Sequence, residues 1–172
     1  MATSPLPAAP AASPEVAEIE RALNRITYLS TRARQHERLM ALAGVPLDRA
    51  AVALLRQIAD SEPLRSGELA NRLGVEASHV TRTVQQLQKS GYVTRVPDPD
   101  DGRAQRIRLT DTGRQAVDAI RDAGARGMQL ALADWSTEDL RQLATLFHRM
   151  VDDFLARAAA VESEAEGQAP GA

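Results

Sequence analysis

The stretch from Ser66 to Gly91 constrains the fold most, because it places two short amphipathic helices on either side of one glycine. With Ser66 as the first position, Ala70 is the fifth, Gly74 the ninth and Val80 the fifteenth. The small side chain of Ala70 lets the second helix cross closely, and Gly74 permits the positive φ of a tight turn. We therefore predict a helix-turn-helix with Ser66 as the N-cap of its first helix.

The outer face of the second helix is polar and free of acids. If Val80, Val84 and Leu87 point inward, the helical period places the opposite face outward. That face comprises Ser78, His79, Thr81, Arg82, Gln85 and Lys89. Such hydroxyl, amide and guanidinium groups read base edges in DNA, and Arg82 is the best candidate for a bidentate contact with guanine. The alternative is an ordinary solvated face, although such faces usually mix Glu with Lys.

Two β-branched runs come next, Tyr92–Val96 and Arg106–Leu109, separated by the polar stretch PDPDDGRAQ. This pattern predicts a hairpin with a long tip, and a hairpin directly after the second helix makes a winged helix. Arg103 at the tip suits insertion into a minor groove, and Asp101 would hold the tip by pairing with Arg103 or accepting backbone N–H bonds. The flanking candidates for phosphate contacts are Arg95, Arg106 and Arg108. A solvated Asp/Gly/Pro turn is the alternative.

The formal net charge of -2 hides an uneven distribution. Between residues 65 and 114 there are nine Lys and Arg against six Asp and Glu, which gives +3 and leaves -5 for the remainder. The basic middle coincides with the predicted helix-turn-helix and hairpin, as expected of a nucleic-acid-binding region.

Composition excludes several other classes of protein. The chain has no Cys, which rules out disulfides, Cys-type zinc sites, iron–sulfur clusters and thiol redox chemistry. Only 3% of the residues are aromatic and 26% are charged, which favours a mostly helical protein. No apolar run is long enough to span a membrane, so we expect a cytoplasmic protein without membrane contact. His36, His79 and His148 have no ligand spacing, and no catalytic motif is present, so we expect no metal, no cofactor and no enzymatic activity.

The remaining helices are marked by their caps. Ser13 and Pro14 start a helix that is expected to run to about Leu42, and Asp48 caps the next helix. Further caps are expected at Thr110, for a helix reaching about Ala133, and at Ser136 with Asp139 for the last helix.

The resulting organisation has three functional parts and two tails. We expect disordered tails at 1–12 and 160–172, an N-terminal dimerisation helix at 13–47, a winged helix-turn-helix lobe at 48–112 and C-terminal dimerisation helices at 113–159. The alternative to a dimer is a monomer in which the apolar faces of the terminal helices cover the middle domain.

Two runs resemble the MarR family of transcriptional regulators. They are SGELANRLGVEASHVTRTVQQLQKSGYVTR at 66–95 and DPDDGRAQRIRLTDTG at 98–113. The second run is the more specific, because it combines an Asp-rich wing, Asp-x-Arg, and Leu-Thr-x-x-Gly at the start of a helix. The resemblance extends over about residues 15–158. It implies a mostly α fold with a small β-hairpin wing, and a homodimer whose lobes each dock a recognition helix in the major groove.

Carried onto this sequence, the resemblance implies base and phosphate contacts by Ser78, His79, Thr81 and Arg82, and a minor-groove contact by Arg103. Asp101 would stabilise the wing, and Ser66 would cap its helix near a phosphate. One departure concerns the start of the recognition helix, where family members often have a Ser-Pro-like cap and this chain has Glu76 and Ala77.

The resemblance also implies a repressor, less often an activator, on a pseudo-palindromic operator with half-sites about 10 bp apart. A small aromatic or phenolic effector would bind between the dimer region and the lobe. Tyr28, Arg32 and His36 share one face of the expected first helix at i, i+4 and i+8 and are its candidate ligands; an exposed or dimer-facing stripe is the alternative. The alternative function is a winged-helix module for protein–protein contact.

Overall fold

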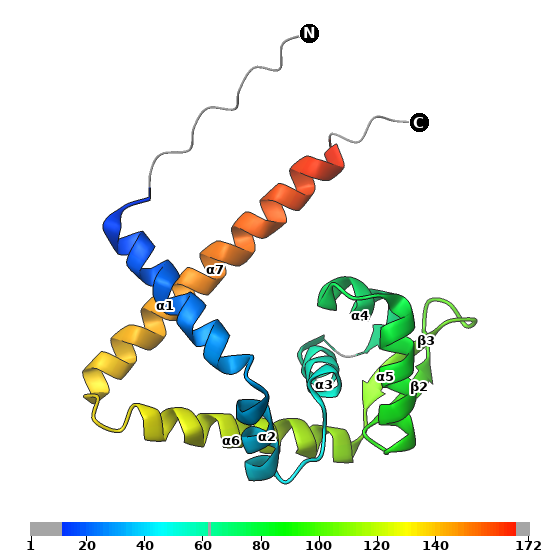
Figure 1. Ribbon diagram of the computed structural model, residues 1–172. Helices are drawn as coiled ribbons and strands as arrows, with labels where there is room; N and C mark the ends of the chain where they lie inside the picture. The colour runs from blue at the N-terminus through cyan, green and yellow to red at the C-terminus, as the bar shows by residue number, and fades with distance from the viewer. Residues whose placement is uncertain (1–11, 62, 168–172) are drawn as a thin grey trace. The chain divides into compact units, whose positions relative to one another are not determined.

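The computed structural model describes residues 12–61 and 63–167, with side chains as far as residue 160 (Figure 1). The chain forms two compact units, residues 1–126 and 127–172. The tail expected at 1–12 lies outside the described residues except for its last residue. Within the tail expected at 160–172, the backbone is helical as far as Gly167, and residues 168–172 lie outside the description.

The centre of the first unit is a winged helix-turn-helix. Its helices are α3 (Arg49–Ser61), α4 (Ser66–Leu73) and α5 (Ala77–Lys89), and its strands are β1 (Leu64–Arg65), β2 (Val93–Pro97) and β3 (Gln105–Leu109). The side chains that these elements share are at most 1% exposed: Leu54, Leu55, Ile58, Leu69, Val80, Val84, Leu87 and Ile107. The expected inward face of the second helix is therefore confirmed.

The turn between α4 and α5 has the expected geometry. Gly74 is the C-cap of α4, with φ of 61°, a left-handed conformation that glycine adopts without steric cost. The N-cap of α4, however, is Arg65 rather than Ser66, which becomes the first helical residue. The reason is the Glu68 carboxylate, which reaches back to accept the Arg65 backbone N–H at 2.7 Å.

The sheet has three antiparallel strands in the order β1-β3-β2, so β3 is central. The predicted hairpin is confirmed as β2 and β3, which lie beside α5 in Figure 1. Strand β1 was not predicted, because two residues carry no periodic signal and acquire strand structure only by pairing with β3. In this pairing Leu64 lies opposite Ile107 in the core, and Arg65 lies opposite Arg106.

The single N-terminal helix expected to reach about Leu42 is wrong. It breaks into α1 (Pro14–Ser30) and α2 (Ala33–Ala43), and the backbone of Arg32 between them is extended. The hydroxyls of Ser30 and Thr31 donate to the carbonyls of Thr27 and Tyr28 at 2.9 and 3.0 Å. Such local bonds compete with helix propagation, which explains why the helix ends at this Ser-Thr pair.

Helix α2 packs on a second small core, which consists of Met40, Val45, Val52, Ala116 and Ile120. The last two of these belong to α6 (Asp111–Ala131), so this core joins the N-terminal segment to the helix that follows the wing. Helix α1 contributes no buried residue.

Three of the expected caps are confirmed in the first unit. Ser13 Oγ accepts the Val16 N–H at 3.4 Å and Asp48 Oδ1 accepts the Ala51 N–H at 2.8 Å. Thr110 Oγ1 accepts the Gly113 N–H at 3.0 Å, while the Thr110 backbone N–H donates to the Tyr92 carbonyl at 3.0 Å. Thr110 thus starts α6 and ties it to the segment that joins α5 to β2.

The second unit contains α7 (Thr137–Gly167), which begins at the expected cap. Ser136 Oγ accepts the Asp139 N–H at 3.1 Å and donates to the Asp139 carboxylate at 2.5 Å. Large apolar side chains remain exposed along α7, namely Leu143, Leu146, Phe147, Val151, Phe154 and Leu155. Among the described residues, no helix has the length and apolar character that a membrane crossing requires.

Among the glycines that the structure describes, Gly113 is the one whose added Cβ would meet neighbouring atoms, and its replacement tests the junction of α6 with the wing. A Cβ at Gly113 would lie 2.0 Å from the Tyr92 carbonyl oxygen, so Gly113→Ala must displace backbone. We expect the free energy of unfolding, measured in urea, to fall by about 2–3 kcal/mol.

The control is Gly124→Ala on the same helix, where a Cβ would meet nothing within 4 Å. This substitution is expected to stabilise the protein by about 0.5–1 kcal/mol through helix propensity. Equal effects of the two substitutions would show that the close approach at Gly113 is unimportant.

Candidate nucleic-acid interface

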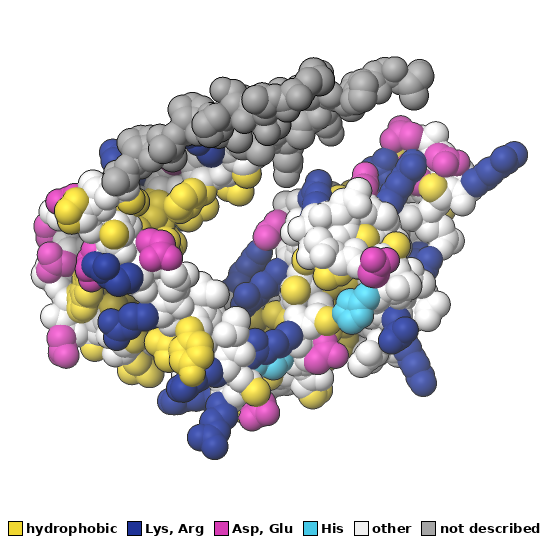
Figure 2. All heavy atoms as spheres, turned by 45° about the horizontal axis from the view of Figure 1, so that its top comes forward, with side chains coloured by type: hydrophobic (Ala, Val, Ile, Leu, Met, Phe, Trp, Pro, Cys, Tyr) yellow, Lys and Arg dark blue, Asp and Glu magenta, His cyan; other side chains and the backbone are white. Residues whose placement is uncertain are grey.

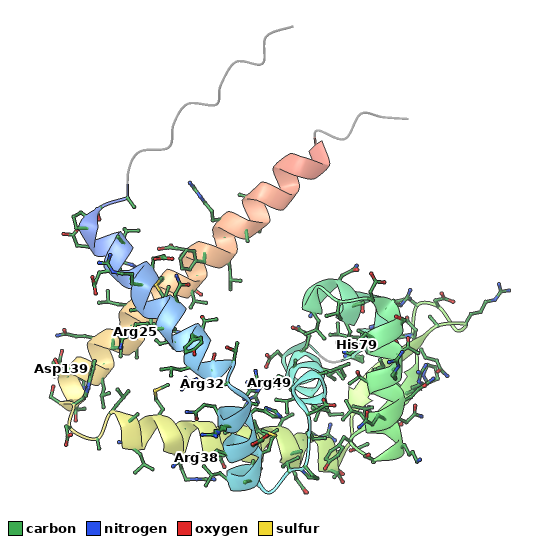
Figure 3. All side chains as sticks on the ribbon, viewed as in Figure 1. Arg25, Arg32, Arg38, Arg49, His79 and Asp139 are labelled. Atoms are coloured by element: carbon green, nitrogen blue, oxygen red, sulfur yellow. The ribbon has the colours of Figure 1, made fainter. Side chains whose placement is uncertain are left out.

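The structure places the proposed recognition residues together on the exposed face of α5. Ser78, His79, Thr81, Arg82, Gln85 and Lys89 are all exposed. Figure 3 shows His79 near the beginning of the helix. Their common orientation follows from the burial of Val80, Thr83, Val84 and Leu87 on the opposite face.

The side chains on this face differ in which hydrogen-bonding groups they offer. Thr81 Oγ1 donates to the Ala77 carbonyl at 2.9 Å, so it presents a methyl group and acceptor lone pairs outward. The side chains of Arg82 and Lys89 make no hydrogen bond to any residue that the structure describes. Their cationic donors are therefore available to a ligand. Glu76 is the N-cap of α5 without a side-chain capping bond, as its side chain predicts.

The tip of the hairpin is a turn held by backbone and Asp side-chain bonds. The Asp98 N–H donates to the Ala104 carbonyl at 3.1 Å, and the Ala104 N–H donates to the Asp101 carbonyl at 2.8 Å. Asp101 Oδ1 accepts the Arg103 N–H at 3.0 Å, so Asp101 acts within the turn. The Arg103 side chain has no partner among the described residues and is exposed.

A buried carboxylate anchors the base of this tip. Asp98 is only 3% exposed, and its Oδ2 accepts from Arg65 Nε at 2.5 Å and from Arg106 Nε at 2.7 Å. Its Oδ1 accepts from the Asp100 N–H at 2.9 Å and from a terminal nitrogen of Arg106 at 3.2 Å. One side chain thereby joins β1, β3 and the wing turn.

These bonds hold the pKa of Asp98 well below its ordinary range. The hydrogen bond from Arg65 contributes most, followed by that from Arg106, and together they outweigh the opposing effect of burial. The pKa values of Arg65 and Arg106 are raised, in both cases chiefly by the hydrogen bond to Asp98. All three groups therefore stay charged across the physiological pH range.

Sequence reasoning did not single out Asp98, because its importance depends on strand register. Asp98 faces Ala104 across the hairpin, which makes Arg106 its diagonal neighbour. Arg65 arrives from β1, whose existence the sequence does not signal. The usable signal is the hairpin register alone, since it brings an acid at the end of β2 beside a base on β3.

The phosphate-contact role expected for Arg106 stays a prediction, and the structure shows that this side chain already has carboxylate partners. Its guanidinium is engaged by Asp98 and also by Asp100, at 2.9 Å, because β3 directs it toward both carboxylates. Arg95 instead turns toward the recognition helix, where its Nε lies 3.3 Å from Gln88 Oε1. Figure 2 shows Lys and Arg side chains mixed with Asp and Glu at the wing end.

The proposed effector ligands Tyr28, Arg32 and His36 do not share one helical face, because the helix breaks between Ser30 and Ala33. The Arg32 guanidinium lies over the Tyr28 ring, 5.0 Å from its centroid, and both side chains are exposed. His36 lies on α2, with Nε2 2.8 Å from the Leu47 carbonyl oxygen. Figure 3 shows Arg32 at the join of α1 and α2.

Within the described residues, no group of three His, Cys, Asp or Glu side chains is arranged to hold a metal ion. The polar groups on the exposed face of α5 are instead hydrogen-bond donors and acceptors, together with cationic side chains that have no partner among the described residues. Groups of this kind are chemically suited to an anionic ligand that has donor and acceptor edges.

Comparison with known proteins agrees with this geometry. The model of the MarR family matches residues 47–104, from the start of α3 to the wing tip. The uncharacterized HTH-type transcriptional regulator YdgJ of Bacillus subtilis is 31% identical over 97 residues, or 56% of this chain and 59% of that protein. The alignment thus spans less than two thirds of YdgJ. The uncharacterized HTH-type transcriptional regulator Mb0904 of Mycobacterium bovis is 31% identical over 63% of this chain and 78% of its own length.

Solved structures show the same fold. A MarR family protein from Bacillus stearothermophilus has a TM-score of 0.72 at 21% identity, over 82% of this chain and 96% of that chain. The transcriptional regulator Tm0710 from Thermotoga maritima has a TM-score of 0.59 at 25% identity, over 89% of this chain and 99% of that chain. The winged helix-turn-helix arrangement is therefore confirmed independently.

Replacement of the buried carboxylate tests the anchor of the wing. Because the pKa of Asp98 is lowered in the folded protein, the unfolded chain binds the proton more readily. The contribution of the ionised Asp98 side chain to the free energy of unfolding is thus complete above about pH 4 and is lost as the pH falls further. We expect Asp98→Asn to have a lower urea midpoint than the parent at pH 7, with a difference that narrows toward pH 3.

Asp100→Asn is the matched control, since Asp100 is exposed and pairs only with Arg106 among the described residues. It should shift the urea midpoint little at either pH. A difference between parent and Asp98→Asn that is constant with pH would mean that the ion pairs contribute nothing to folding.

Proposed function

This chain belongs to the MarR family, and from that premise we propose that it is a sequence-specific DNA-binding transcriptional regulator, acting as a repressor. The observation that carries the proposal is the exposed face of α5. It is cationic and polar, has no acid between Ala77 and Lys89, and is fixed in orientation by a fully buried opposite face.

In the proposed complex, α5 lies in the major groove with its N-terminal half against base edges. Arg82 donates two parallel bonds to the O6 and N7 of a guanine. Ser78, His79, Thr81 and Gln85 contact neighbouring base edges or phosphates, and Lys89 contacts the backbone. Arg103 enters the adjacent minor groove, where the negative potential is focused.

We propose further that the protein is a homodimer on a pseudo-palindromic operator. The support is the exposed apolar surface of the terminal helices. Helix α1 buries none of its residues, and α7 exposes a stripe that includes Leu146, Phe147 and Phe154. A dimer buries such a stripe against its copy and presents two recognition helices to half-sites about 10 bp apart.

Release from DNA by a small aromatic or phenolic effector and action in the cytoplasm complete the proposal. Both rest on family membership alone. Without Cys, regulation by thiol oxidation has no chemical basis in this chain.

The proposal is tested by selecting duplexes bound by the purified protein from a random-sequence library. We expect an enriched pseudo-palindrome whose affinity falls steeply with salt. The alternative function, a winged-helix module for protein–protein contact, is favoured if no sequence is enriched and binding to DNA shows no steep salt dependence.

Arg82→Ala then tests the base contact. On the selected duplex we expect a loss of about 1–3 kcal/mol, roughly 5- to 150-fold in Kd, and relaxed preference at one base position. Arg82→Lys keeps the charge but lacks the planar guanidinium. It should relax the preference at the same base position, and on a scrambled duplex its loss of affinity should be smaller than that of Arg82→Ala. Equal losses on selected and scrambled duplexes would reduce Arg82 to a phosphate contact.

The dimer is tested with Phe147→Asp on the exposed stripe of α7. Placing a charge in a buried apolar interface is strongly unfavourable, so sedimentation at micromolar concentration should shift from dimer toward monomer. Thr145→Asp introduces the same group on the other side of the helix and should leave the dimer intact. A parent protein that sediments as a monomer would overturn the dimer.

A further inference from the structure

Two arginines face each other across the paired strands β1 and β3, where they share one carboxylate. Arg65 on β1 is directly opposite Arg106 on β3. Like charges in this position destabilise a sheet, because the side chains are neighbours on the same face. Asp98 offsets the repulsion by accepting the Nε–H of both.

The two guanidiniums are not used equally. Arg106 donates to Asp98 through two nitrogens and to Asp100 as well, and its side chain is 23% exposed. Arg65 donates only from Nε, and its side chain is 40% exposed. Among the described residues, no acceptor lies on either terminal nitrogen of Arg65. The guanidinium of Arg106 is thus occupied by contacts within the protein, whereas Arg65 retains two terminal nitrogens that can donate to a ligand.

Arg65 also occupies a particular place in the fold. It is the N-cap of α4, the first helix of the helix-turn-helix, and Asp98 ties its guanidinium to the base of the wing. In helix-turn-helix complexes the first helix crosses the DNA backbone while the second lies in the groove. Arg65 therefore stands between two elements that both approach the phosphates.

We propose that Arg65 is a DNA-phosphate contact whose guanidinium is oriented by Asp98, an inference that rests on the DNA-binding function proposed above. The bond from Nε to Asp98 leaves both terminal nitrogens without an acceptor among the described residues. A phosphate there accepts charge-assisted hydrogen bonds from a planar group that is already held in place. Asp98 is a positioning residue for this contact, acting through Arg65.

A purely structural role for Arg65 makes a different prediction. If Arg65 only braces the wing, its loss weakens binding by the same factor at every salt concentration. A phosphate contact instead releases a counterion, and its loss lowers the slope of log K against log salt by about 0.9. The slope of log K against log salt therefore distinguishes the two roles, even though loss of Arg65 weakens binding in either case.

The experiment measures the affinity of the full chain for its selected duplex between 50 and 200 mM KCl. The variants are Arg65→Ala, Arg65→Gln, which retains a donor for Asp98, and Arg121→Ala. Arg121 is the charge-matched control, because it pairs with Asp60 at 2.8 Å on the exposed surface of α3 and α6. Thermal unfolding confirms that each variant is folded.

We expect both Arg65 variants to bind more weakly, with a parent-to-variant affinity ratio that falls about 3.5-fold between the two salt concentrations. Arg121→Ala should keep the parental slope. In an Asp98→Asn background, Arg65→Ala should weaken binding less than it does in the parent, because Arg65 is no longer oriented.

An unchanged slope in both Arg65 variants overturns the phosphate contact and leaves the DNA-binding function intact. A parent protein without salt-steep DNA binding overturns the proposed function itself, and the inference with it. Additive losses in the Asp98→Asn background overturn the positioning role of Asp98.

Discussion

The burial of one face of α5 is the constraint on which the rest of the lobe depends. Val80, Val84 and Leu87 are at most 1% exposed and pack among α3, α4 and the sheet. Because a helix has a fixed period, burying this face determines which residues point to solvent. The polar surface is thus rigidly presented, and a rigid surface binds with less loss of conformational entropy.

The wing depends on a different interaction, the buried Asp98 carboxylate. A two-stranded hairpin is only marginally stable alone, and here the base of its tip is tied to β1 by Arg65 and braced by Arg106. A buried carboxylate is tolerated because both its oxygens are hydrogen-bonded to cationic or backbone donors. The side chain of Arg103 at the exposed tip takes no part in this network.

Helix caps and the helix-turn-helix could be predicted because their signals are local. Asp48 and Thr110 each bond a backbone N–H three residues further on, so the sequence contains both partners. The same locality should have revealed the break after α1. The Ser30 and Thr31 hydroxyls bond carbonyls three residues back, but the apolar period running through them suggested a continuous helix.

By itself, the sequence determined the winged helix-turn-helix and the residues on the outer face of α5, because periodicity and capping act within a few residues. Only the tertiary structure decided which wing aspartate is the anchor and which arginines remain available. Those answers depend on the pairing of β1 with β3, which sets Arg65 against Arg106 and brings Asp98 to both. Strand pairing joins residues more than thirty positions apart, and no local pattern encodes its register.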